Sequence, residues 1–415
     1  MTAPGLLDGI RVLEVAVLFN GDVLGQHLAD LGADVVKIES PGRGDYLRDM
    51  LGQIGPHQSP AHLQVNRNKR SITLDVRGDA GREVFWRLLD TADVFVDGLL
   101  AGSCDRMGIG YEAQRQRKPA IIYCHCSGFG ATGPYAAVPT HGQMMNALAG
   151  SISLATDDEG FVRVTPNEEL MSGTSGGGDG TAAAAVHAAL RTAAALVRRD
   201  RTGMGAYLDA AGADAVIAQG WIGAVYGWNE HRLTDRRGLR PAGTPPQSSA
   251  RYQYYATADE RFVLFCAIEH KFWQRFCAEV GRPELTGEAA ADGSPIEFAH
   301  GDGGLRHTLQ AIFRSRTQAE WVQLAIAADI PIGPAHQGVG ALRDDPHLAS
   351  RQILLESDHP QAGAFTYVGS PVIVDGEPFR VRRPAPALGE HSRELLDELG
   401  YDADAIERLR TDGVV

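Results

Sequence analysis

The sequence predicts an α/β fold that begins with a Rossmann-like unit. Residues 10–19 (IRVLEVAVLF) are almost entirely apolar, as expected for a strand that is buried on both faces of a parallel sheet. Residues 23–31 predict a short helix, and residues 33–39 (ADVVKIE) predict a second strand. A strand, a turn, a helix and a strand in this order form a βαβ unit. The turn at 20–22 (NGD) lacks the G-x-G-x-x-G fingerprint, so a dinucleotide is not expected to bind there.

Further strands and helices are expected along the first half of the chain. Buried strands are predicted at 72–76, 93–96, 120–123 and 207–209, and helices at 81–91, 180–199 and 210–226. Residues 151–175 are polar without a clear period, and we expect them to be irregular.

The chain length favours two domains, since 415 residues exceed the usual size of one. Residues 229–250 are rich in Arg, Gly and Pro and predict the passage into a second domain. The following stretch has its own strands and helices as far as the IPIGP segment at 330–334. We therefore place domain boundaries near residues 225 and 335.

The composition is that of an ordinary soluble protein, with 44% hydrophobic and 22% charged residues. The net charge of −13 argues against nucleic acid or an anionic membrane as the main partner. The five cysteines are scattered and no N-terminal signal pattern is present, which predicts reduced thiols and a cytoplasmic location. No apolar run approaches the roughly 18 residues of a membrane span.

A metal site is not expected. Cys124 and Cys126 flank His125, but their surroundings predict a strand and no second Cys/His pair is near in sequence.

The stretch GGGDG (176–180) and the Ala-rich run after it suggest a functional element. Asp179 precedes a predicted helix from about 180 to 199, whose N-terminal N–H groups are free. Asp179 as a simple N-cap is the more frequent role for such a residue. A plain N-cap, however, does not need three preceding glycines, which let backbone and ligand approach closely.

A basic run, NRNKRS, precedes the strand predicted at 72–76. Three of its side chains are cations that could bind phosphates: Arg67, Lys69 and Arg70. A solvated surface turn is the alternative interpretation, because charge runs are usually exposed.

Six ordered blocks resemble the class III CoA-transferases, which include formyl-CoA and carnitine CoA-transferases and are related to 2-methylacyl-CoA racemases. The blocks are LADLGADVVKIESPGRGDYLR (28–48), NRNKRSITLDV (66–76), SGFGATGPYA (127–136), RRDRTGMGAYLDA (198–210), FCAIEHKFWQRFCAEVGRPEL (265–285) and RRPAPALGEHSRELLDELGY (382–401). The resemblance covers nearly the whole chain.

The resemblance implies a Rossmann-like large domain formed by both chain ends, with residues 1–225 in its N-terminal part and 336–415 in its C-terminal part. It implies an inserted smaller α+β domain at 226–335. It also implies a homodimer of two subunits that are threaded through each other as interlocked rings.

The resemblance further implies a covalent reaction. Asp179, preceded by Gly178, matches the family's nucleophile by context. Its carboxylate would attack an acyl-CoA, and the released CoA thiolate would then form an aspartyl-CoA thioester, from which a carboxylic acid acceptor takes CoA. The expected ligands are thus an acyl-CoA and a carboxylic acid, with no tightly bound cofactor.

The CoA contacts implied by the resemblance are Lys37, Lys69, Arg70, Arg106, Met107 and Gly21. Two departures stand out. Asp97-Gly98-Leu99 occupies a place where relatives often have Asn-Phe, so one adenine-side contact is expected to be missing. Asp22 follows Gly21 where a proline is usual, an odd choice near an anionic cofactor.

A racemase is the competing prediction, since His141 and Glu269 have counterparts among the racemases. His141 and Asp179 would then exchange the α-proton of a 2-methylacyl-CoA from opposite faces. Against it, the racemase Gly-His-Asp is Thr140-His141-Gly142 here, and the segment at 330–334 resembles transferases. A non-catalytic CoA-binding protein is a third possibility, although the presence of Asp179 argues against it.

Overall fold

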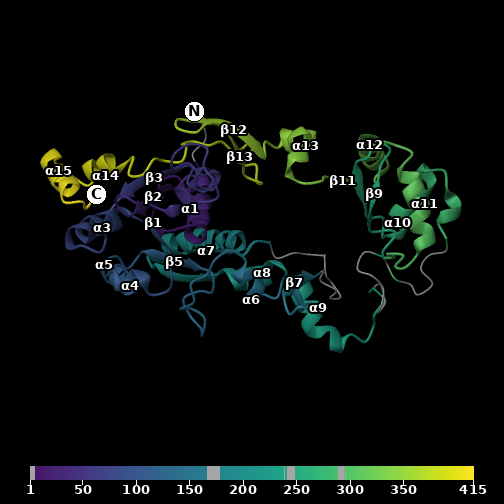
Figure 1. Ribbon diagram of the computed structural model, residues 1–415, viewed down its shortest axis with the longest axis horizontal. Coiled ribbons are helices and arrows are strands. Elements are labelled where there is room, and N and C mark those ends of the chain that lie inside the picture. The colour runs from purple at the N-terminus through teal and green to yellow at the C-terminus, as the bar shows by residue number, and fades with distance from the viewer. Residues whose placement is uncertain (1–4, 166–177, 238, 241–247, 288–293, 295) are drawn as a thin grey trace. The chain divides into compact units, whose positions relative to one another are not determined.

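The computed structural model describes residues 5–165, 178–237, 239–240, 248–287, 294 and 296–415 (Figure 1). These residues form two compact units. The first unit contains described residues 5–165, 178–221 and 351–415, and the second contains those within 222–350. The sequence analysis places its boundaries near residues 225 and 335.

The first unit is built on a six-stranded sheet with the strand order β3-β2-β1-β4-β5-β8. All five strand pairs are parallel. The strands are β1 (Arg11–Ala16), β2 (Asp34–Glu39), β3 (Lys69–Thr73), β4 (Val94–Gly98), β5 (Ile122–Ser127) and β8 (Ala206–Ala211). The predicted α/β fold with a parallel sheet is therefore confirmed. The chain moves outward on both sides of the β1/β4 pair, which makes this pair the topological switch point.

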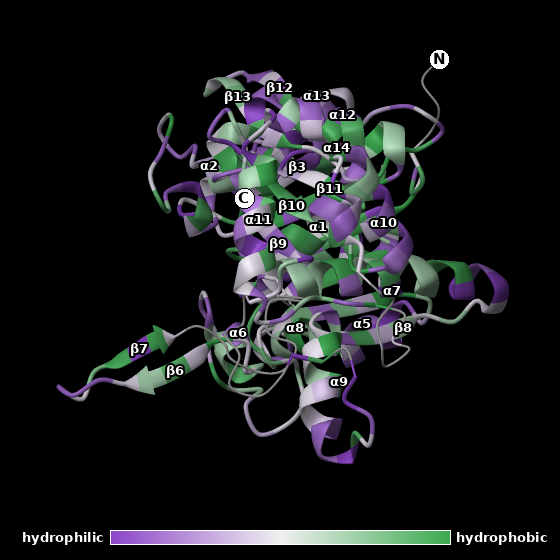
Figure 2. Cartoon of the chain, turned by 90° about the vertical axis from the view of Figure 1, so that its right-hand side faces the viewer, coloured by the Kyte–Doolittle hydropathy of each residue, from purple (hydrophilic) through white to green (hydrophobic). Residues whose placement is uncertain are grey.

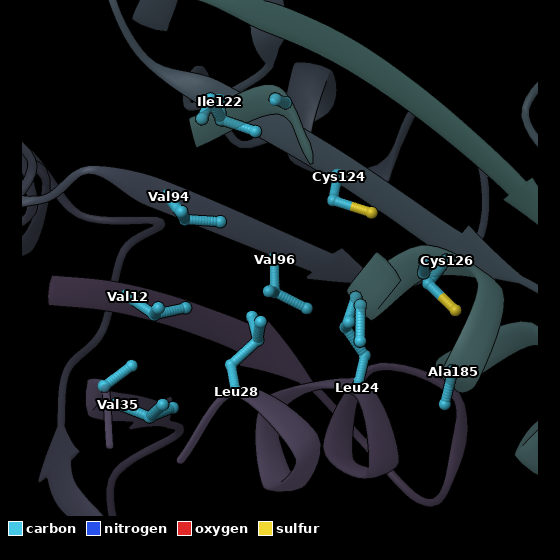
Figure 3. Close-up of a cluster of buried hydrophobic side chains, with 14 of the residues drawn as sticks. Val12, Leu24, Leu28, Val35, Val94, Val96, Ile122, Cys124, Cys126 and Ala185 are labelled. Carbon is cyan, nitrogen blue, oxygen red and sulfur yellow. The ribbon is translucent and has the colours of Figure 1, made fainter. Parts of the chain in front are cut away.

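Two layers of helices bury the sheet. α1 (Asn20–Asp30) and α7 (Gly180–Thr202) cover one face, where Leu24 and Leu28 of α1 meet Val12, Val94 and Val96 (Figure 3). α3 (Asp79–Thr91), α14 (Ser392–Glu398) and α15 (Ala403–Thr411) cover the other face. The shorter helices of the unit are α2 (Pro60–Val65), α4 (Ser103–Arg106), α5 (Tyr111–Arg117), α6 (Met144–Leu148) and α8 (Gly212–Gln219).

By length and composition α7 could cross a membrane, although the sequence analysis expected no such run. However, 56% of its most apolar stretch is buried within the structure. Its small residues, such as Ala184, Ala185 and Ala188, pack in the core with α1 and β5. A buried core helix meets the same criteria, so α7 is only weak evidence for a membrane span.

Two local predictions were wrong. Residues 153–165 form an antiparallel hairpin of β6 (Ser153–Thr156) and β7 (Val162–Thr165), visible in Figure 2, instead of an irregular stretch. Its strands are only four residues long, too short to show a period. The helix predicted at 210–226 is two helices, α8 and α9 (Trp221–Asn229), separated at Gly220.

A second hairpin, β12 (Leu354–His359) with β13 (Gly363–Val368), also belongs to the first unit.

The second unit is a three-stranded antiparallel sheet with helices. Its strands are β9 (Gln253–Ala256), β10 (Phe262–Phe265) and β11 (Ile332–Ala335), in the order β11-β10-β9. Its helices include α10 (His270–Glu279), α11 (Gly303–Phe313), α12 (Gln318–Ala328) and α13 (Pro346–Ser350). Trp273, Phe276, Phe313 and Trp321 form its fully buried aromatic core.

A buried ion cluster joins β1, β2 and the start of α1. The Nζ atom of Lys37 in β2 lies 3.3 Å from Glu14 Oε1, 2.5 Å from Asp22 Oδ1 and 3.0 Å from Asp45 Oδ2. It also donates to the carbonyl of Ala16 at 3.1 Å. These charged side chains have no exposed surface, so water does not screen their interaction.

Lys69 extends the cluster to β3. Its Nζ atom lies 2.7 Å from Glu14 Oε2 and donates to Asp22 O at 2.9 Å and Asn66 Oδ1 at 3.0 Å. The cluster thus holds three carboxylates, from Glu14, Asp22 and Asp45, against two ammonium groups. Burial, reinforced by the Glu14 carboxylate, raises the pKa of Asp22, and burial raises the pKa of Asp45 to about 6. The pKa of Lys37 stands well above its ordinary value because the three carboxylates outweigh its burial.

The switch point depends on a close backbone contact between Gly21 and Gly98. A Cβ atom at Gly21 would lie 2.5 Å from Ala16 Cβ and 2.9 Å from Gly98 Cα, and a Cβ at Gly98 would lie 2.8 Å from Gly21 Cα. Only two glycines let the first turn of α1 meet the end of β4 here.

We expect Lys37→Met to lower the free energy of unfolding by about 3–5 kcal/mol, because the buried carboxylates of Asp22 and Asp45 would lose their ammonium partner. Urea unfolding at constant pH measures this. Arg115→Met is the matched control, since Arg115 pairs with Glu112 on the surface, and we expect little change. Equal effects of the two substitutions would contradict the role assigned to the cluster.

We expect Asp45→Asn to reduce the pH dependence of stability. The folded protein favours the protonated form of Asp45, whose pKa is raised from 3.8 to about 6. Its contribution is present below the ordinary pKa and is lost as the pH rises through about 6. Without that group, the decline in unfolding free energy between about pH 4 and pH 7 becomes smaller, by up to about 3 kcal/mol. An unchanged decline would show that Asp45 does not titrate in this range.

We expect Gly21→Ala to destabilise the protein by about 1–3 kcal/mol, because the added methyl group has no room. Gly223→Ala is the control. Nothing lies within 4 Å of a Cβ at Gly223, which is in helix α9. That substitution should be neutral or stabilising by up to about 1 kcal/mol. Thermal unfolding of both variants measures the difference. Equal melting temperatures for Gly21→Ala and Gly223→Ala would contradict the role of the glycine contact.

Candidate active site

A pocket of about 550 Å³ lies at the carboxyl ends of β1, β4 and β5. In open parallel sheets this edge, at the switch point, is where ligands bind. Val17, Leu18 and Asn20 follow β1, Gly98, Leu99 and Leu100 come from the end of β4, and Ser127, Gly128 and Phe129 come from the end of β5. The remaining lining residues are Tyr46, Arg77, Arg82, Ser103, Arg106, Met107, Ala136, Val138, Pro139, Thr140 and His141.

The buried ion cluster shapes one wall of this pocket. Leu18 has a φ of 60°, an uncommon backbone conformation for a branched residue. Its N–H donates to Asp45 Oδ1 at 3.1 Å, and the same oxygen accepts from Leu47 N at 2.9 Å. Asp45 therefore fixes both the loop after β1 and the turn that carries Tyr46, which lines the pocket.

Three guanidinium groups make the pocket suitable for phosphates. Arg106, on α4, donates to Ser103 Oγ at 2.9 Å, and Arg82, on α3, pairs with Asp79. Within the described residues, no carboxylate lies within ion-pair distance of Arg77 or Arg106. The pocket thus offers cations that the chain itself does not neutralise, although its net charge is negative.

Of the predicted CoA contacts, Arg106 and Met107 line the pocket. Gly21 does not line it but supports it, since its contact with Gly98 lets Gly98 form part of the wall.

Lys37, Lys69 and Arg70 are placed differently. Lys37 and Lys69 are fully buried in the ion cluster. Arg70 is 5% exposed and binds Asp34, Glu394 and Glu398, which connects β3 to α14. The charges of all three are balanced by carboxylates of the chain, and this arrangement favours a structural role over contact with CoA.

Asp179 lies at the N-terminus of α7 with its carboxylate exposed. Its Oδ1 atom accepts from Thr181 N at 2.9 Å and from Ala182 N at 3.2 Å. No hydrogen bond to Oδ2 occurs among the described residues. Gly178 before it has a φ of +71°, which favours glycine. Gly176 and Gly177, singled out in the sequence, lie outside the described residues.

The short helix α6 links Asp179 to the pocket. Asn146 Nδ2 donates to Gly178 O at 2.7 Å, and Asn146 Oδ1 accepts from Gly180 N at 3.1 Å, so one side chain holds the backbone on both sides of Asp179. The chain enters α6 from His141, which lines the pocket and whose N–H contacts Met144 Sδ at 3.4 Å. Helix α6 thus connects the two residues: His141 precedes it in the chain, and its Asn146 holds the backbone around Asp179.

Glu269 belongs to the second unit, where it precedes α10 and forms a β-bridge with Ile296. His141 and Asp179 belong to the first unit. Glu269 is therefore not part of the pocket described above.

Sequence reasoning missed Arg77, Arg82, Asn146 and Ser127. Arg77 and Arg82 flank the start of a helix after a strand, a position at the ligand edge of a parallel sheet, and this was a usable signal. Asn146 gave none, because its partners are more than 30 residues away along the chain.

Comparisons with known proteins identify the family of the chain. The family model described as CoA-transferase family III matches residues 7–392. The chain is 30% identical to an acyl-CoA transferase of Fusarium pseudograminearum (100% of this chain, 89% of that protein). It is 29% identical to the succinyl-CoA:glutarate CoA-transferase of Mus musculus (99% and 90%) and 29% identical to a formyl-CoA:oxalate CoA-transferase of Rhodopseudomonas palustris (99% and 97%).

Solved structures are similar as well. Rv3272 from Mycobacterium tuberculosis matches with a TM-score of 0.71 and 27% identity, over 94% of this chain and 99% of that one. A CAIB/BAIF family protein from Brucella suis matches with a TM-score of 0.70 and 25% identity, over 96% and 100%. The family match covers both units and the residues that line the pocket. The chain therefore belongs to CoA-transferase family III and is an enzyme of that class.

Proposed function

We propose that this enzyme moves CoA from an acyl-CoA to a carboxylic acid through an aspartyl-CoA thioester on Asp179. The observation that carries the proposal is the exposed Asp179 carboxylate, which Asn146 and the N-terminus of α7 hold in one orientation. Oδ1 is occupied by two N–H groups, and Oδ2 has no partner among the described residues. A carboxylate is a weak nucleophile, so fixed geometry is the main help that a protein can give it.

The reaction follows from this arrangement. Asp179 Oδ2 attacks the thioester carbonyl, the C–S bond breaks, and CoA thiolate leaves a mixed anhydride on Asp179. The thiolate then attacks the aspartyl carbonyl, which releases the first acid as a carboxylate and leaves aspartyl-CoA. The acceptor acid reverses both steps. Each step passes through an oxyanion, which backbone N–H groups beside Asp179 would stabilise.

The pocket supports a binding mode for CoA. Its phosphates would contact Arg77, Arg82 and Arg106, and its thioester would extend toward His141 and α6, which leads to Asp179. Glutarate and oxalate, in the names of two relatives, are both dicarboxylic acids. We therefore propose a dicarboxylic acid as acceptor. A homodimer of interlocked subunits and a cytoplasmic location belong to the same proposal.

We expect a covalent CoA adduct on Asp179. The protein is incubated with succinyl-CoA, formyl-CoA and other donors, with and without borohydride, and its mass and peptides are then measured. Asp179→Asn should abolish the adduct and lower transfer by at least about a thousandfold, as is usual when a nucleophile is lost. Asp200→Asn, at the other end of α7, is the control and should retain both.

Other outcomes would decide between the alternatives. Exchange of the substrate α-proton in heavy water without an adduct would favour the racemase with His141 and Asp179 as bases. CoA binding with neither reaction would favour a non-catalytic protein.

We expect Arg106→Ala to weaken CoA binding by about 10- to 100-fold, the effect of losing one charge-assisted hydrogen bond. Calorimetric titration with CoA measures this. Arg115→Ala, on the nearby helix α5, removes a surface arginine outside the pocket and should leave the affinity unchanged. If both variants bind CoA like the wild type, the phosphate contacts lie elsewhere.

A further inference from the structure

A row of three polar side chains leads from inside the sheet to the pocket. Asp97 is near the end of β4, and His125, which lies opposite it in the register, is on β5 with Ser127. His125 Nδ1 lies 3.2 Å from Asp97 Oδ2, and His125 Nε2 lies 3.0 Å from Ser127 Oγ. Asp97 and His125 are 3% and 2% exposed, whereas Ser127 is a lining residue of the pocket.

The carboxylate of Asp97 favours one tautomer of His125. Asp97 Oδ1 accepts from Leu99 N at 3.0 Å, and Oδ2 accepts from the Tyr123 hydroxyl at 2.6 Å. A carboxylate can only accept, and a lone pair on Nδ1 would face its oxygen at 3.2 Å, so the arrangement favours the tautomer with the proton on Nδ1. Nε2 is then an acceptor, and the Ser127 hydroxyl donates to it.

This orientation leaves the Ser127 oxygen with only lone pairs to offer the pocket. It would repel a phosphate or carboxylate oxygen and attract an N–H group. Gly128, the next residue, packs closely against Thr140, because a Cβ on Gly128 would lie 2.2 Å from Thr140 Oγ1. The Ser127 hydroxyl therefore lies near the segment that leads to His141. CoA carries N–H groups in two places, the adenine amino group and the two amides of its pantetheine arm.

We propose that Asp97, His125 and Ser127 form a subsite that accepts an N–H group of bound CoA. Ser127 makes the contact, and Asp97 and His125 are positioning residues that fix the direction of its hydroxyl. The proposal rests on CoA binding in this pocket, which is part of the proposed function.

The test is a double-mutant cycle on CoA affinity, measured by calorimetry. Ser127→Ala removes the acceptor and should weaken binding by about 3- to 10-fold, the usual effect of one neutral hydrogen bond. Asp97→Asn permits the other His125 tautomer, which turns Ser127 into a donor, and should weaken binding at least as much. In the Ser127→Ala background, Asp97→Asn should add nothing, because its effect acts through the hydroxyl.

Tyr123→Phe is the matched control. It removes the hydrogen bond from the Tyr123 hydroxyl to Asp97 Oδ2 but leaves Asp97, His125 and Ser127 in place, so we expect affinity within about twofold of the wild type. Additive losses in the cycle, or an equal loss in Tyr123→Phe, would show general disturbance of β4 and β5 and would overturn the proposal. Thermal unfolding of each variant identifies those that have not folded, and Ser127→Thr, which restores the hydroxyl, should recover binding.

Two fragments of CoA identify the N–H group. If Ser127→Ala weakens adenosine 3′,5′-bisphosphate, the adenine amino group is the donor, and if it weakens pantetheine, an amide is the donor. If Ser127→Ala weakens the binding of neither fragment nor CoA, while the wild type binds CoA and Arg106→Ala weakens that binding, the subsite alone is overturned. If the wild type does not bind CoA, the subsite and the proposed function both fail. Labelling of Ser127 by a fluorophosphonate would also overturn it, because the hydroxyl would then be a nucleophile.

Discussion

The interaction on which the first unit depends is the buried cluster of Lys37 and Lys69 with Glu14, Asp22 and Asp45. Charges removed from water are costly unless paired, so a register shift that separated these side chains would be strongly disfavoured. The cluster therefore aligns β1, β2 and β3 and fixes the start of α1 beside them. Burial raises the pKa of Asp45, and the neighbouring Asp22 carboxylate adds to this effect.

The same cluster fixes the backbone of the pocket wall, although none of its charged side chains lines the pocket. Asp45 holds the N–H of Leu18 in a backbone conformation that the residue would otherwise rarely adopt. Lys37 neutralises Asp22, which explains how an acidic residue is tolerated in the first turn of α1, near a site for an anionic molecule. Two arginines of the pocket, Arg77 and Arg106, lie outside the cluster and have no ion-pair partner among the described residues.

Local patterns were sufficient to predict the parallel sheet, because β1, β2 and β4 are mostly apolar and buried and the helices are periodic. They were also sufficient to single out Asp179, whose glycines and helix are adjacent in sequence. They could not separate structural from binding cations. NRNKRS indicates positive charge, but whether Lys69 meets a phosphate or Glu14 depends on a partner 55 residues away. The β6–β7 hairpin was not predicted for another reason: a strand of four residues is too short to show an alternating pattern.

The departures from the family pattern at Asp22 and Asp97 have a common physical explanation. Each places a carboxylate near the pocket that we propose for the anionic CoA. Neighbours within the fold contact each carboxylate: Lys37 contacts Asp22, and Tyr123, His125 and Leu99 contact Asp97. A carboxylate with such partners orients the groups around it and repels an anionic ligand less. At Asp97 the orientation passes along His125 to a hydroxyl on the pocket wall, so the expected loss of one adenine-side contact can be offset by a contact of opposite polarity at Ser127.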